Sequence, residues 1–375
     1  MKKILFNLTQ TELEQFITDM GLPRFRATQI REWLNRGAPD FNVMKNLPED
    51  LRKKLNDTAQ TLPLNIVKRL DSTDNQTTKF LLELEDGQQI ECVLMRTTYG
   101  NSVCVSSQAG CAMGCKFCAS TLLGLKRNLT INEMFAQILV AQWELRRNRF
   151  DTENVRPNGD ANNGDVSHIV VMGTGEPLQN TSNVIGFLNR ANTELHISWR
   201  RITVSTCGIV PGIQELTAWG QPINLAISLH APTDELRSQI MPINNKYKLG
   251  EVLNAAFEFS DAQNRQLMIE YILLGKRDEN GDIALYNCSN EHAEKLSDIL
   301  RGHNVMVNLI PWNTVDERDF ASISGNAVHR FQDILIKNGI HTRIRRERGA
   351  DIGSACGQLR LKHNQDLSIK KTVNL

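Results

Sequence analysis

Three cysteines lie close together in the middle of the chain, at Cys111, Cys115 and Cys118. Their C-x3-C-x2-C spacing places three thiols in one short loop. A 4Fe-4S cluster needs four ligands, and cysteine thiolate is the usual one. Three clustered cysteines without a fourth beside them therefore predict a cluster with one open iron, to which a small molecule can bind.

A structural zinc site is the alternative interpretation of these cysteines. Zinc in such sites is held by four Cys or His ligands in a tetrahedron. No second cysteine pair stands at the spacing of a zinc ribbon, so the iron-sulfur cluster is favoured. If the cysteines bound zinc instead, the alternative function would be that of a zinc-stabilised RNA-binding protein without catalytic activity.

The composition limits the cellular setting of the protein. Its eight cysteines in 375 residues form no disulfide pattern, since three share one loop, and a reducing cytoplasm fits them best. The apolar run at the N-terminus is too short for a signal peptide, and no run of about 18 apolar residues could span a membrane. The formal net charge is only +1, so the protein as a whole does not attract nucleic acid strongly. Any contact with nucleic acid must therefore come from local basic patches. We expect a cytoplasmic monomer that does not contact membranes.

Residues 8 to about 60 are predicted to form a small helical module. Apolar residues recur at helical spacing after Thr9 and Thr11, and again over residues 26–34. Basic side chains on this module could bind RNA phosphates without regard to sequence: Arg24, Arg26, Arg31, Arg36, Lys45, Arg52, Lys53 and Lys54. The same charges are equally consistent with a solvent-exposed helix face that does not bind RNA. On such a face the basic residues would be balanced by acidic ones, namely Glu12, Glu14, Glu32 and Glu49.

The pattern then changes from helices to strands. Residues 64–95 alternate with period two, and the Asp86-Gly87 turn predicts a β-hairpin. From about residue 100, six strands alternate with helices, which predicts a parallel sheet covered by helices. The expected strands are 102–106, 168–172, 202–206, 223–228, 267–272 and 305–310. We expect an α/β fold, a partial (β/α)6 barrel with a small N-terminal helical domain and a β-hairpin extension.

The expected domain boundaries follow these changes of pattern. We expect residues 1–62 to form a helical accessory domain, which could bind RNA, and residues 63–98 to form a β-hairpin linker. Residues 99–362 form the catalytic barrel, and residues 363–375 form a C-terminal tail. Two polar segments, 148–165 and 276–290, are rich in Asn, Asp and Gly and are predicted surface insertions.

Polar residues and glycines follow several expected strands, at the barrel end where active residues lie. The second strand is followed by Gly173-Thr-Gly-Glu-Pro177, a turn that lets the backbone approach a ligand closely. Ser205, the segment Ser228-Leu-His230 and Asn313 stand at the ends of three further strands. Because these ends meet at one edge of the sheet, we expect them to share a single ligand.

These motifs together resemble the RlmN family of radical S-adenosylmethionine (SAM) enzymes, which methylate C2 of adenine in RNA. The resemblance runs from about residue 10 to 362 and rests on residues 104–111, 124–129, 172–178, 227–232, 309–313 and 351–359. It implies a radical SAM barrel with one 4Fe-4S cluster and SAM as cofactors. The implied substrates are adenine 2503 of 23S ribosomal RNA, before full assembly of the ribosome, and adenine 37 of transfer RNA. The implied electron donor is a flavodoxin or ferredoxin.

The resemblance also implies a role for each candidate residue. The cluster ligands are Cys111, Cys115 and Cys118. The residues that bind SAM are Gly175, Glu176, Ser205, Ser228, Leu229, His230 and Asn313. Cys356 carries the methyl group as S-methylcysteine, and Glu91 accepts the C2 proton. Cys104 resolves the adduct through a transient disulfide with Cys356.

A sister family, the Cfr-type methyltransferases that act on C8 of adenine, shares the cysteine pattern and is the alternative. Its members typically have Ala where this chain has Pro177 and lack the Pro311-Trp312 pair, which favours C2 chemistry. The chain departs from the RlmN pattern at Cys207, where many relatives have Ser, and in the lengths of the two insertions. We expect Cys207 to be a small buried residue.

Overall fold

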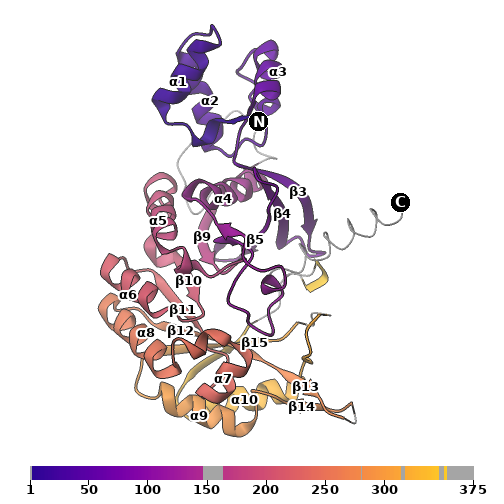
Figure 1. Cartoon of the computed structure of the whole chain (residues 1–375), viewed down its shortest axis with the longest axis vertical. Coiled ribbons are helices and arrows are strands. Elements are labelled where there is room, and N and C mark those ends of the chain that lie inside the picture. Colours follow the sequence, from indigo (N-terminus) through magenta and orange to yellow (C-terminus); the bar gives the residue numbers. More distant parts are fainter. Residues whose placement is uncertain (1, 147–163, 280, 314–316, 346–349, 353–375) are drawn as a thin grey trace.

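The computed structural model describes residues 2–146, 164–279, 281–313, 317–345 and 350–352. Three N-terminal helices form a small module at one end of the molecule, and the remaining elements are built around one sheet (Figure 1). No helix within these ranges is both long and apolar enough to cross a bilayer.

The N-terminal module packs α1 (Gln10–Asp19), α2 (Phe25–Asn35) and α3 (Glu49–Thr58) around an apolar core. Thr9 starts α1 with a capping box, because its hydroxyl accepts from the Glu12 N–H while the Glu12 carboxylate accepts from the Thr9 N–H. The core of the module is fully buried and contains Leu13, Ile17, Ala27, Ile30, Leu34 and Leu55. The short parallel strands β1 (Lys3–Ile4) and β2 (Ala59–Gln60) join its two ends.

A ten-stranded sheet forms the centre of the molecule, in the order β16-β15-β12-β11-β10-β9-β6-β5-β4-β3. Its strands are β3 (Leu64–Asp71), β4 (Thr77–Leu84), β5 (Gln89–Thr97), β6 (Gly100–Cys104), β9 (Val166–Val171), β10 (Ile202–Thr206), β11 (Asn224–Ser228), β12 (Leu267–Leu273), β15 (Val305–Pro311) and β16 (His341–Ile344). The strands from β6 to β16 are parallel, whereas β3 to β6 are antiparallel. The hairpin of β4 and β5 therefore extends the barrel sheet itself.

Helices pack along the parallel part of the sheet (Figure 1). They are α4 (Ile131–Arg146), α5 (Thr181–Leu195), α6 (Val210–Trp219), α7 (Asp234–Ile240), α8 (Leu249–Gln263), α9 (Asn290–Leu300) and α10 (Gly325–Lys337). Single-turn helices occur at η1 (Leu5–Asn7), η2 (Phe41–Val43), η3 (Ala119–Thr121), η4 (Pro177–Gln179), η5 (Trp199–Arg201), η6 (Pro242–Asn245) and η7 (Ala350–Ile352). The parallel strands are rich in buried Val, Ile and Leu because helices cover one side and the barrel interior closes the other.

The expected partial (β/α)6 barrel is confirmed, with one strand more than the six predicted. The additional strand, β16, pairs in parallel with β15 at the edge of the sheet. The predicted insertion at 276–290 contains the antiparallel strands β13 (Gly275–Arg277) and β14 (Ile283–Leu285). The other predicted insertion, 148–165, lies outside the described residues except for its last two positions.

Candidate active site

The strand register brings a set of polar side chains onto the inner face of the barrel. Residues paired across neighbouring strands project to the same side of a sheet, as do residues two apart on one strand. The residues aligned in this way are, from strand to strand, Lys79, Glu91, Cys104, Val170, Ser205, Ser228, Glu270, Asn308 and Arg343. Three predicted site residues on separate strands, Cys104, Ser205 and Ser228, therefore share one surface with Glu91.

The three clustered cysteines lie in a loop between β6 and α4. The short strands β7 (Gln108–Ala109) and β8 (Arg127–Asn128) pair at the base of this loop. Gly110 has a φ of +88°, and a Cβ there would lie 1.8 Å from the carbonyl oxygen of Gly124. Only glycine permits this approach. The closed base of the loop keeps Cys111 and Cys115 buried beside the strand ends.

Residues from distant parts of the chain hold the cysteine loop against the barrel. The Phe117 ring packs edge-on against His230, with ring centroids 4.8 Å apart. Trp312 Nε1 donates a hydrogen bond to the Phe117 carbonyl at 3.4 Å. Arg318 donates to the Cys118 carbonyl and to the Thr121 hydroxyl. The end of β15 and the segment after β11 are therefore in direct contact with the loop.

Cys111 and Cys115 are buried, whereas Cys118 is half-buried. Burial raises the pKa of the Cys111 thiol to about 12 and raises that of Cys115 well above its ordinary value, and neighbouring Cys118 raises both further. Among the described residues, no group of three or more His, Cys, Asp or Glu side chains converges on a single metal ion. Cluster thiolates bind different irons, so they need not converge. Burial therefore disfavours the thiolate form of Cys111 and Cys115, and binding of a cluster to these cysteines as thiolates releases protons.

The glycine-rich turn after β9 packs against the chain that leads into the cysteine loop. Gly175 has a φ of +112°, and a Cβ there would lie 2.6 Å from the Gln108 side chain. The buried Glu176 carboxylate accepts hydrogen bonds from Thr206 Oγ1 at 2.6 Å and from the Cys207 N–H at 2.8 Å. Burial raises the pKa of Glu176, and these hydrogen bonds oppose that shift. The carboxylate thus fixes the turn to the end of β10.

The other residues predicted to bind SAM stand at three strand ends. Ser205 and Ser228 are half-buried on the inner face, and Leu229 is fully buried. His230 has a φ of +61°, and its Nδ1 accepts a hydrogen bond of 3.0 Å from a backbone N–H of β12. Burial lowers the pKa of His230 to about 3, so the ring is neutral and carries its proton on Nε2. Asn313 follows β15 and is half-buried.

Glu91 and Cys104 are buried on adjacent strands of the inner face. Cys104 pairs with Val93, which places Glu91 at a diagonal position roughly 7–8 Å away. Glu91 Oε2 forms an ion pair of 3.0 Å with Nζ of Lys79, whose side chain is fully buried. The Glu91 carbonyl accepts a hydrogen bond of 2.6 Å from the Ser106 hydroxyl. The site therefore contains a carboxylate with a fixed partner beside a thiol.

Sequence reasoning missed a second buried carboxylate on the inner face. Both oxygens of Glu270 accept hydrogen bonds from Asn308 Nδ2, at 3.1 and 3.2 Å. Burial raises the pKa of Glu270, and the charge of Arg345 opposes this shift. Glu270 also pairs in register with Ser228. The sequence does contain an indication of this residue, because Glu270 is the one acidic residue within the apolar strand β12.

Sequence reasoning also missed a fully buried arginine beneath the predicted SAM residues. Arg237 of α7 donates hydrogen bonds to the carbonyls of Leu229 and Cys207, at 3.1 and 2.6 Å, and to Asn244 Oδ1 at 2.9 Å. Burial lowers the pKa of Arg237. This side chain ties the ends of β10 and β11 together. Cys207 is buried, as expected.

Cys356 and the surrounding loop lie outside the described residues. The described part of the chain ends in η7, where the Asp351 carboxylate accepts a hydrogen bond of 2.8 Å from the Thr73 N–H. Asp351 follows the edge strand β16, and Thr73 follows the other edge strand, β3. This contact therefore joins the two open edges of the barrel sheet.

The site fits the cofactors that its residue types suggest. Two buried hydroxyls, Ser120 Oγ beside the cysteine loop and Thr174 Oγ1 in the glycine-rich turn, have no hydrogen-bond partner in the part of the chain that the structure describes. Buried polar groups are nearly always paired, so each of these two hydroxyls could form a hydrogen bond with a polar ligand. Three thiols can bind a cluster with an open iron.

Comparison with known proteins assigns this fold and site to a class. The family model of the radical SAM superfamily matches residues 105–284, and the ribosomal RNA large subunit methyltransferase N-terminal domain matches residues 4–61. A crystal structure of a radical SAM methyltransferase from Sphaerobacter thermophilus has a TM-score of 0.78 and 39% identity, covering 95% of this chain and 98% of that one. The protein is therefore a radical SAM protein.

Curated relatives define the family more closely. A protein of Alkaliphilus oremlandii is 44% identical over 98% of this chain and 100% of its own length. Relatives from Clostridium acetobutylicum and Staphylococcus aureus are 43% and 42% identical, over 98% and 97% of this chain and 99% and 94% of their own. Each is described as a "probable dual-specificity RNA methyltransferase RlmN". The chain belongs to the RlmN family of radical SAM RNA methyltransferases.

Proposed function

We propose that this protein methylates C2 of adenine, at position 2503 of 23S ribosomal RNA before full assembly of the ribosome and at position 37 of transfer RNA. The observation that supports this proposal best is the position of Glu91 and Cys104 on adjacent strands of the inner face. A buried carboxylate beside a thiol suits removal of a proton followed by attack of sulfur.

The chemistry of the target explains why such an enzyme needs a cysteine to carry the methyl group. Adenine C2 is an electron-poor carbon without a lone pair, so it cannot displace a methyl group from the sulfonium of SAM. We assign the carrier role to Cys356, whose thiolate is the reactive form. The proposed cluster ligands are Cys111, Cys115 and Cys118, and the proposed SAM residues are Gly175, Glu176, Ser205, Ser228, Leu229, His230 and Asn313. The cluster, when bound, supplies the electron that cleaves SAM to a 5′-deoxyadenosyl radical.

The residues of the chain then act in order. Cys356 accepts a methyl group from one SAM, and this methyl group gives a hydrogen atom to the radical from a second SAM. The methylene carbon bonds to C2, and the one surplus electron of the adduct would return to the cluster that supplied the first electron. Glu91, held in one orientation by Lys79, takes the C2 proton. Cys104 attacks the Cys356 sulfur, which breaks the carbon–sulfur bond, and the released carbon gains a proton to become the new methyl group. The protein is left with a Cys104–Cys356 disulfide.

Other parts of the chain have proposed roles in delivering the substrate and the electron. Residues 1–62 would bind RNA as an accessory domain, with residues 63–98 as the linker. Residues 99–362 would form the catalytic unit, followed by the tail at 363–375. A flavodoxin or ferredoxin is the proposed electron donor to the cluster, and the protein would act as a monomer.

Nucleoside mass spectrometry tests the position of the methyl group. After anaerobic incubation with SAM, a reductant and 23S ribosomal RNA, we expect 2-methyladenosine. Pro177 and Trp312 follow the pattern of the C2 family, and Trp312 is buried against the cysteine loop. A Cys115→Ala variant, which lacks one proposed cluster ligand, should leave the RNA unmodified. Detection of 8-methyladenosine would instead place the protein with the Cfr-type enzymes.

A further inference from the structure

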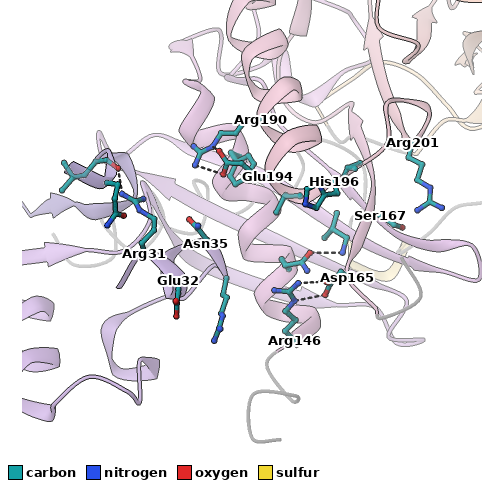
Figure 2. Close-up of a pocket in the computed structure, with 18 of the residues that line it drawn as sticks. Arg31, Glu32, Asn35, Arg146, Asp165, Ser167, Arg190, Glu194, His196 and Arg201 are labelled. Atoms are coloured by element: carbon teal, nitrogen blue, oxygen red, sulfur yellow. Dashed lines mark hydrogen bonds and ion pairs between the residues drawn. The ribbon is translucent and has the colours of Figure 1, made fainter. Parts of the chain in front are cut away.

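A cleft of about 700 Å³ lies between the N-terminal module and the barrel. Figure 2 shows residues of α2 on one side of it and residues from α4 and α5 on the other. The start of β9, at Val166 and Ser167, also lines the cleft. The glycine-rich turn with Gly175 follows the other end of β9. The cleft is therefore separated from the proposed active site by the length of this strand and turn, roughly 25 Å.

The lining of the cleft carries more positive than negative charge. Its charged side chains are Arg31, Arg36, Arg146, Arg190 and Arg201, with Glu32, Asp165 and Glu194. Two carboxylates are already occupied, because Arg146 is paired with Asp165 and Arg190 with Glu194 (Figure 2). Within the described ranges, no ion pair joins Arg31, Arg36 or Arg201 to a carboxylate. Three arginines around the cleft are thus available to an anion.

Arg31, one of these three arginines, lies near Arg190 and its partner Glu194 in the same cleft. Arg31 is half-buried, and its guanidinium donates a hydrogen bond to the Leu8 carbonyl. Burial lowers the pKa of Arg31, the nearby charge of Arg190 lowers it further, and the charge of Glu194 opposes this shift. Arg190 is held in place by its pair with Glu194 and lies 4.2 Å from the Phe135 ring centroid. One carboxylate, Glu194, thus faces two guanidinium groups, so this part of the cleft keeps a positive charge that attracts a further anion.

We propose that this cleft binds a phosphate group, and that the backbone of the RNA substrate supplies it while the target adenine occupies the barrel. The guanidinium group is planar and can bind a phosphate through two parallel hydrogen bonds. Backbone contacts position a nucleic acid without reading its sequence. Because the separation of roughly 25 Å far exceeds one nucleotide, the phosphate belongs to another part of the same RNA. This inference rests on the proposed RNA substrate.

A pair of substitutions at the cleft tests the proposal. The Arg36→Gln/Arg201→Gln variant removes two cleft charges and leaves the Arg31 hydrogen bond to Leu8 intact. Binding of transfer RNA to the full-length protein is measured by fluorescence anisotropy at several salt concentrations. A lost phosphate contact makes the slope of log affinity against log salt shallower by about 1, and we expect this change for the variant. The iron content of both proteins, measured in parallel, reports that the barrel is intact.

The matched control removes two charges outside the cleft. Lys295 on α9 and Arg301, which directly follows α9, form exposed ion pairs with Glu291 and Asp298, so Lys295→Gln/Arg301→Gln should keep the wild-type slope. An unchanged slope in the cleft variant would overturn the RNA assignment.

A second measurement, of the thermal midpoint of unfolding with and without AMP, distinguishes a free nucleotide from RNA. If AMP raises the midpoint of the wild-type protein but not that of the cleft variant, and both proteins have the same RNA slope, the phosphate comes from a free nucleotide. Equal slopes and equal midpoints would overturn the whole proposal. Failure of the wild-type protein to bind RNA would instead contradict the proposed function.

Discussion

A Cys104→Ala enzyme should become trapped on its RNA. This variant can still methylate Cys356, form the bond from the methylene carbon to adenine and lose the C2 proton to Glu91. No thiol then remains to attack the Cys356 sulfur, so the carbon–sulfur bond stays intact. Released product should fall below detection. A protein–RNA complex should appear as a slow band on a denaturing gel and should disappear after ribonuclease treatment.

Two further cysteine variants separate the roles of the thiols. Cys356→Ala has no sulfur to carry the methyl group, so it should neither modify RNA nor become linked to it. Cys92 is buried on β5 and donates to the Gln137 carbonyl, so Cys92→Ala should turn over and is the matched control. All three variants should retain iron, because each leaves the cysteine loop intact. Normal turnover by Cys104→Ala, or a covalent complex with Cys356→Ala, would contradict the assigned roles.

A Glu91→Gln enzyme should form the same covalent complex for a different reason. An amide cannot accept the C2 proton, and loss of a general base typically costs about 10²–10⁴-fold in rate. We therefore expect product formation, followed by nucleoside mass spectrometry, to fall by at least about 10²-fold. The RNA adduct should accumulate, since Cys104 can release the methyl carbon only after the proton has left.

Stability must be separated from chemistry at this position. Removal of one partner from a buried ion pair typically costs about 3–5 kcal/mol, and Glu91→Gln removes the carboxylate charge from the buried Lys79–Glu91 pair. The Lys79→Met/Glu91→Gln variant removes both charges and should recover part of the lost free energy of unfolding, measured with urea. It should remain as inactive as the single variant. A double variant with wild-type activity would exclude Glu91 as the proton acceptor.

Local sequence patterns predicted the elements of this fold well. The helical spacing of apolar residues predicted α4 at residues 131–146, and the alternation around Asp86-Gly87 predicted the hairpin of β4 and β5. These predictions are reliable because the spacing of buried residues in a helix or a strand depends only on a few neighbouring residues. The strand ends were also predictable, since parallel strands bring their carboxyl ends to one edge.

Contacts between distant segments could not be predicted in the same way. The Trp312 hydrogen bond to Phe117 joins residues 195 positions apart, and the Arg318 contact with Cys118 joins residues 200 positions apart. In the sequence, Lys79 has no feature that distinguishes it from other residues of the hairpin. Only the strand register shows that it lies beside Glu91 and pairs with it. The basic cleft likewise assembles from α2, α4 and α5. The catalytic role of Cys356 rests on family resemblance and stays a prediction.

The iron content of anaerobically purified protein tests the central claim most directly. If Cys111, Cys115 and Cys118 hold a 4Fe-4S cluster, the protein should be brown and contain about four irons per chain. A Cys111→Ala/Cys115→Ala/Cys118→Ala variant, prepared in the same way, should be colourless and free of iron. A colourless wild-type protein with one zinc per chain would contradict the radical SAM mechanism and would favour a zinc-stabilised RNA-binding protein.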